Sequence, residues 1–131
     1  MYEILAAIDE HENRARAQAR AIADLPRDPA DLHVVLFHDF TDNPEGASVS
    51  QVAAVRRAKE VLDDAGIDVE LDESSGKPAE SILSEAGKRD VDLVSLSGRK
   101  RTPTGKALFG SVTQAVILGA DRAVMVSNPS E

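Results

Sequence analysis

The sequence predicts an α/β protein: a five-stranded, mostly parallel sheet with helices on both faces. Two observations support this class. Short apolar runs of the length of buried strands alternate along the chain with segments whose apolar residues recur at helical spacing. Glycine, proline and other turn formers separate the segments, which gives the order β-α-β-α-β-α-β-α-β. Alternating strands and helices favour parallel strands joined by right-handed crossovers, and therefore a three-layer sandwich.

The first third of the chain contains two buried strands with a helix between them. Residues 2–9 and residues 32–39 are short and almost wholly apolar, as parallel strands covered on both faces are. Residues 12–25 are rich in alanine and arginine, place apolar residues at helical spacing, and are followed by Pro26 as a terminator.

The middle of the chain adds a helix and a strand of different character. Residues 41–48 collect turn formers and are predicted to be a loop. Residues 52–65 carry one apolar helical face, and Gly66 is placed to cap its end. Residues 67–72 alternate apolar and acidic side chains, so one face of this strand meets solvent, which suits the edge of a sheet.

The last third supplies two further helix–strand units. Pro78 stands at a favoured first helical position, and an apolar face follows it. Residues 91–97 form the fourth strand, whereas residues 98–110 lack a regular period and are predicted to be a loop. A short helix over residues 111–118 ends at Gly119, and residues 122–127 form the last strand.

Length and composition limit the class of protein. A chain of 131 residues is the usual size of one domain, so we expect residues 1–131 to form a single domain. The absence of cysteine removes disulfides, thiolate nucleophiles and cysteine metal sites. The longest apolar runs are too short to span a membrane, and acidic residues interrupt the region where a signal peptide would lie. We therefore expect a cytoplasmic protein.

The charge balance is strongly acidic. The chain has 23 acidic and 15 basic residues, a formal net charge of −8. A surface of this sign repels nucleic acid, so we expect neither nucleic acid nor a membrane as a partner. The excess of aspartate over glutamate and of arginine over lysine resembles proteins of salt-accumulating microbes, in which concentrated cations screen the repulsion. An ordinary acidic protein is the alternative.

One segment runs against this acidic average. Ligands of open α/β sheets bind beyond the carboxyl ends of the strands, and residues 97–113 follow the fourth strand. The segment contains no acidic residue and four of the 15 basic ones: Arg99, Lys100, Arg101 and Lys106. Gly98, Gly105 and Gly110 expose backbone amides, and Ser111 and Thr113 lie at a helix start. Free amides at a helix start and basic side chains predict a phosphate site; the alternative is a solvated basic loop with a plain helix cap.

Other sites are less well supported by the spacing. The P-loop and dinucleotide fingerprints do not match. Four residues that follow neighbouring strands could hold a divalent ion, although they lack the spacing of known ligand pairs: Asp9, His11, His38 and Asp39. His33 alternates with apolar neighbours and is interpreted as a packed or capped histidine. A phospho-acceptor receiver domain has the same element order, but this chain has Ser127 and Asn128 where that class needs a lysine.

Four sequence motifs together resemble the universal stress protein family. They are AAID at residues 6–9, LFHDF at residues 36–40, GKPAESIL at residues 76–83, and Gly98 followed by Gly110-Ser111-Val112-Thr113 ahead of a short helix and a last strand. The resemblance implies the strand order 3-2-1-4-5, an architecture like that of the adenine nucleotide alpha hydrolases, and a homodimer formed through the last strand, from Ala123 to Val126.

The resemblance also implies roles for particular residues. Asp9 would contact the adenosine part of a nucleotide, Gly98 would let the backbone approach phosphate, and four consecutive residues would cradle the phosphate oxygens: Gly110, Ser111, Val112 and Thr113. This chain departs from the family pattern at Arg101, which replaces a glycine and could itself pair with phosphate. The loop is one residue short, and Asp39 stands where an apolar residue normally flanks adenine.

The resulting expectation is a universal-stress-type regulatory or protective protein. It would bind an adenine nucleotide, ATP or AMP, with Mg²⁺ beside the nucleotide, or another phosphate anion, at residues 98–113. Two alternatives remain open: a structural or interaction protein of the same fold without a ligand, and a slow ATP hydrolase. No nucleophile elbow or general base supports catalysis.

Overall fold

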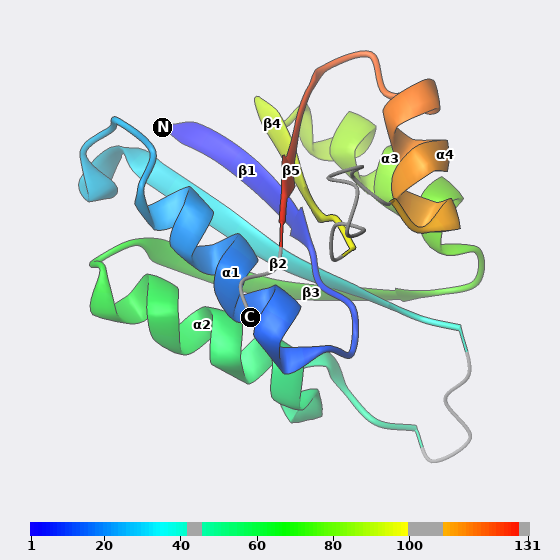
Figure 1. Cartoon of the computed structure of the whole chain (residues 1–131), viewed down its shortest axis with the longest axis horizontal. Helices are drawn as coiled ribbons and strands as arrows, with labels where there is room; N and C mark the ends of the chain where they lie inside the picture. The colour runs from blue at the N-terminus through cyan, green and yellow to red at the C-terminus, as the bar shows by residue number, and fades with distance from the viewer. Residues whose placement is uncertain (42–45, 100–108, 129–131) are drawn as a thin grey trace, which may run out of the picture.

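The centre of the protein is a five-stranded sheet in which every strand pair is parallel (Figure 1). The computed structural model describes residues 1–41, 46–99 and 109–128. The strands are β1 (Tyr2–Ala7), β2 (Leu32–Phe40), β3 (Asp68–Ser75), β4 (Leu93–Ser97) and β5 (Ala123–Ser127). Their spatial order is β3-β2-β1-β4-β5, which confirms the expected order 3-2-1-4-5 and the edge position of the third strand.

Four helices cover the sheet, two on each face. They are α1 (Glu12–Ala23), α2 (Ala53–Asp64), α3 (Pro78–Arg89) and α4 (Ser111–Gly119). Helices α1 and α2 lie on one face, and α3 and α4 lie on the other (Figure 1). The three-layer sandwich is therefore confirmed. Within the three described ranges, no helix is both long and apolar enough to cross a bilayer.

The sheet separates two apolar cores, because side chains of a strand alternate between its faces. On β2, Val34 and Leu36 join the core under α1 and α2, whereas Val35 and Phe37 join the core under α3 and α4. Both faces of the central strands are fully buried, which explains why their sequences read as unbroken apolar runs.

Element boundaries differ from the predictions at helix ends. Helix α1 ends at Ala23, ahead of the predicted residue 25. The ring of Pro26 disfavours the helical conformation of the residue before it, so the helix ends before the proline is reached. Gly66 has a φ of +77°, which confirms its predicted capping role. The fourth strand begins at Leu93, not residue 91, because the Val91 amide still donates to the Ala86 carbonyl of α3.

The acidic face of β3 is less exposed than its alternation predicts. The Arg89 guanidinium of α3 lies over it and contacts Glu70 at 2.6 Å, Asp72 at 2.9 Å and Glu85 at 2.7 Å. The hydrogen bond from Arg89 lowers the pKa of Glu70, with burial opposing it. Ion pairs with Arg89, and not solvent alone, therefore balance the acidic side chains on this face of β3.

His33 completes this cluster from β2. Its Nδ1 lies 2.6 Å from an Asp68 carboxylate oxygen, and its Nε2 lies 3.1 Å from Glu70. Burial lowers the pKa of His33, but the hydrogen bonds to the two carboxylates outweigh it, so the pKa is raised above its ordinary value. The interpretation of His33 as a capped histidine agrees with these contacts.

The sheet opens between β1 and β4. These strands pair only from Ile4 opposite Leu93 to Ala6 opposite Ser95, after which β1 continues along β2 alone. The Gln18 side chain of α1, 1% exposed, fills the point of separation. Its Nε2 lies 3.1 Å from the Ala7 carbonyl oxygen, 2.9 Å from the Ser95 carbonyl oxygen and 3.1 Å from Ser95 Oγ. Gln18 therefore satisfies backbone acceptors that the separating strands leave without a partner.

We expect Gln18→Met to destabilise the protein by about 2 kcal/mol, because methionine keeps the length of the side chain and leaves buried acceptors unpaired. Urea unfolding of the variant measures this loss. Gln114→Met, at an exposed position of α4, is the control and should change stability by less than about 0.5 kcal/mol. Equal unfolding midpoints for the two variants would contradict the role given to Gln18.

Candidate functional site

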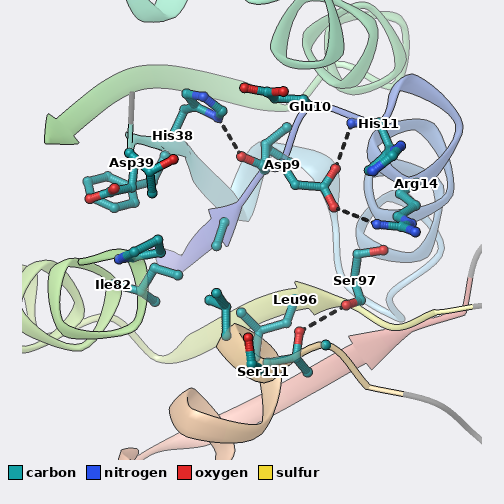
Figure 2. Close-up of a pocket in the computed structure, with 18 of the residues that line it drawn as sticks. Asp9, Glu10, His11, Arg14, His38, Asp39, Ile82, Leu96, Ser97 and Ser111 are labelled. Carbon is teal, nitrogen blue, oxygen red and sulfur yellow. Dashed lines mark hydrogen bonds and ion pairs between the residues drawn. The ribbon is translucent and has the colours of Figure 1, made fainter. Parts of the chain in front are cut away.

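A cavity of about 370 Å³ lies at the carboxyl ends of β1, β2 and β4 (Figure 2). This is the point where the strand order reverses, since β2 and β4 leave β1 in opposite directions along the sheet. The predicted location of the site at the carboxyl edge is where the structure has its cavity.

The floor of the cavity is apolar. Phe37, Leu96 and Ile82 line it, from β2, β4 and α3 respectively. Ala7 of β1 adds a small side chain at the centre, which leaves room above the sheet. A flat organic group can therefore be covered by side chains here, while its polar substituents reach the rim.

The α4 corner of the cavity combines a helix start with a basic side chain. Gly110 is the N-cap of α4 and offers no side-chain cap, so the amides of the first turn remain available. A Cβ built on Gly110 would lie 3.1 Å from Arg99 Nε and 3.2 Å from Nη2, so the guanidinium lies directly against this residue. Among the described residues, no carboxylate pairs with Arg99. A helix start and an unpaired guanidinium face one space.

The structure brings together most of the residues predicted for the phosphate site. Gly110, Ser111, Val112 and Thr113 all line the cavity, and so does Asp9 across from them. The Thr113 hydroxyl, however, donates to the Ser97 carbonyl at 3.0 Å. It ties α4 to the end of β4, so the backbone amide is the part of Thr113 left for a ligand.

Gly98 and Arg101 stand apart from this group. Gly98 does not line the cavity; its amide donates to the Ser127 carbonyl at 2.8 Å, and a Cβ there would approach Val126 Cγ1 at 3.2 Å. The close approach of β5 therefore explains the glycine at position 98 without a ligand. Arg101 and residues 100–108 of the predicted loop lie outside the described residues.

Asp9 is held in place by two donors. The His11 amide donates to Oδ1 at 2.8 Å, and Arg14 Nη1 donates to Oδ2 at 3.2 Å (Figure 2). Within the described ranges there is no group of three or more potential metal ligands. The Arg14 guanidinium already neutralises Asp9, so the described residues of this corner do not fit Mg²⁺.

Some lining residues were not singled out from the sequence, among them Arg14, Thr41 and Leu96. The sequence could have predicted Arg14 as a lining residue, because the first turn of a helix that follows a strand lies over the end of that strand. The sequence suggested two interpretations of His38: a candidate metal ligand, and part of the LFHDF motif that ends the second strand. Its Nδ1 donates to the Ile8 carbonyl at 2.7 Å, and its ring meets Phe40 edge-on with centroids 4.7 Å apart. His38 therefore fixes the end of β2 against the end of β1.

Fold and cavity together define an open α/β protein with a cavity at its strand-order reversal. The model of the universal stress protein family matches residues 1–128. The chain therefore belongs to the universal stress protein family, which replaces the receiver-domain alternative.

Individual relatives agree with this assignment. The chain is similar to a universal stress protein of Mycolicibacterium smegmatis, with 33% identity over 69 residues that cover 52% of this chain and 53% of that protein. The match thus spans about half the length of the curated relative. A universal stress protein structure from Archaeoglobus fulgidus has a TM-score of 0.77 and 26% identity, covering 97% of this chain and 98% of that one.

A second similar structure contains a ligand. It is a universal stress protein family protein from Arabidopsis thaliana with AMP bound. Its TM-score is 0.73 at 15% identity, and the alignment covers 99% of this chain and 93% of that chain. This likeness establishes a shared fold.

Proposed function

We propose that this universal stress protein binds a nucleoside monophosphate in the cavity and acts as a nucleotide-responsive regulatory protein. The observation that carries the proposal is the Arg99 guanidinium, which lies against the uncapped start of α4 and pairs with no carboxylate of the described ranges. In a chain with a formal net charge of −8, such a cation on a cavity wall attracts a small anion specifically. The AMP bound to a protein of the same fold supports the choice of ligand.

The phosphate would accept from the first-turn amides of α4 and from Arg99. The ribose would lie near Asp9, whose carboxylate oxygens keep lone pairs for hydroxyl donors beside the bonds from His11 and Arg14. The base would cover the apolar floor made by Phe37 and Leu96. Each part of the nucleotide thus meets a surface of matching chemistry.

The size of the cavity favours a monophosphate. Ligand sites commonly enclose about 300–1,000 Å³, and about 370 Å³ lies at the low end of that range. The additional phosphates of ATP would have to extend beyond the described wall. AMP is therefore the first ligand to test, and ATP the second.

Arg99→Gln tests the phosphate corner. We expect it to weaken AMP binding by about 10- to 100-fold, because it removes a charge-assisted hydrogen bond. Isothermal titration measures the affinity. Arg56→Gln, on an exposed position of α2 away from the cavity, is the charge-matched control and should leave the affinity unchanged. Absence of heat with AMP and ATP at millimolar concentration would instead favour the ligand-free interaction protein.

We further propose that two copies associate through β5. This strand lies at the edge of the sheet and carries half-buried Val124, Met125 and Val126, and an unpaired edge is a template for a second chain. Leu118, near the end of the preceding helix α4, is 87% exposed, a further uncovered apolar side chain in this part of the chain.

Light scattering should give twice the chain mass for the wild type. Met125→Lys should give the monomer mass, because a charge would be placed beside its own copy in the assembled sheet. Glu60→Lys on α2, which also adds positive charge, is the control and should remain dimeric. A monomer mass for the wild type at high protein and high salt concentration would overturn the dimer.

A further inference from the structure

Asp39 is a polar residue of the cavity wall that lies away from the phosphate corner. It follows Phe37 and His38 near the carboxyl end of β2 and lines the cavity. Its Oδ2 accepts a hydrogen bond of 2.6 Å from the Ser74 hydroxyl of the adjacent β3. Its Oδ1 is buried from solvent and has no hydrogen-bond partner among the described residues. A buried acceptor without a donor is unfavourable, so this position calls for a donor that the described residues do not supply.

Asp39 and the phosphate corner lie at opposite ends of the cavity. Figure 2 shows Asp39 on one side and Ser111 on the other, with Ile82 and Leu96 between them. Strands β2 and β4 are separated by β1, so their ends are two strand spacings apart, roughly 10 Å. A nucleotide whose phosphate contacts α4 would extend its base toward Asp39. Rotation about the soft Cβ–Cγ torsion would turn Oδ1 toward that base.

The two purine bases differ in what they offer a carboxylate. The Watson–Crick edge of guanine presents two adjacent donors, N1–H and the N2 amino group. Adenine presents one donor, the N6 amino group, beside the N1 acceptor, whose lone pair would face a carboxylate oxygen. A carboxylate accepts only, so it pairs twice with guanine and is repelled by part of the adenine edge.

We propose that Asp39 makes this cavity selective for guanine over adenine, so that GMP is preferred to AMP. The proposal rests on the proposed function, since it names the base of the same nucleotide. It is carried by the unpartnered Oδ1 at the end of the cavity that lies opposite Arg99. The same rotation moves Oδ2 away from Ser74, so hydrogen bonds to the base replace the bond from the Ser74 hydroxyl.

Isothermal titration with GMP, IMP and AMP tests the selectivity. We expect wild-type protein to bind GMP about tenfold more tightly than AMP, with IMP between them, because IMP keeps N1–H and lacks the amino group. Asp39→Asn should reverse the order, since an asparagine amide donates to adenine N1 and accepts from N6. Ser74→Ala is the control: it removes the hydrogen bond to Oδ2 and keeps the carboxylate, so GMP should still be preferred.

Three outcomes distinguish the two proposals. AMP binding as tight as GMP binding by the wild type, or no change of order in Asp39→Asn, overturns the selectivity and leaves the nucleotide site intact. A failure of all three nucleotides to bind overturns the nucleotide site and the selectivity together. Should Asp39→Asn not fold, as a thermal melt would show, the wild-type ratio of GMP to AMP decides alone.

Discussion

The separation of β1 from β4 is the constraint on which the site depends. The two strands share three residue pairs and then part, with β1 following β2. The Gln18 amide closes this point from the α1 side by donating to acceptors on both strands. On the opposite face, the divergence leaves the space that becomes the cavity under α3 and α4. Removing the buried glutamine would therefore affect the packing of α1 and the floor of the site together.

The cavity has ends of opposite chemistry. Arg99 and the amides of α4 form a donor-rich, positive end, and Asp39 forms an accepting end across the apolar floor. A simple anion such as inorganic phosphate satisfies only the first end, and an apolar ligand satisfies neither. A nucleotide combines an anionic group, an aromatic plate and donor atoms in one molecule, and this is the combination that the described wall complements.

The sequence predicts the fold well because the fold depends on periodicity, which is local. Apolar runs, helical spacing and residues such as Gly66 and Pro78 each act within a few positions. The place of Gly110 and Ser111 at a helix start beside the cavity was also predictable, since the two residues adjoin in sequence. Contacts between distant residues were not: Gln18 reads as an ordinary helical glutamine until Ser95, 77 positions away, lies beside it. The partner of the Thr113 hydroxyl and the cover of Arg89 over β3 depend likewise on packing.

An amide NMR titration with GMP tests the central claim most directly. If the strand-order reversal creates the site, the largest shifts will fall on the carboxyl ends of β1, β2 and β4 and on the first turn of α4, including Asp9, Asp39 and Ser111. The resonances of residues at the amino ends of the strands, such as Leu32 and Asp92, will not shift. Shifts spread evenly over the surface, or centred on those amino ends, would contradict the account.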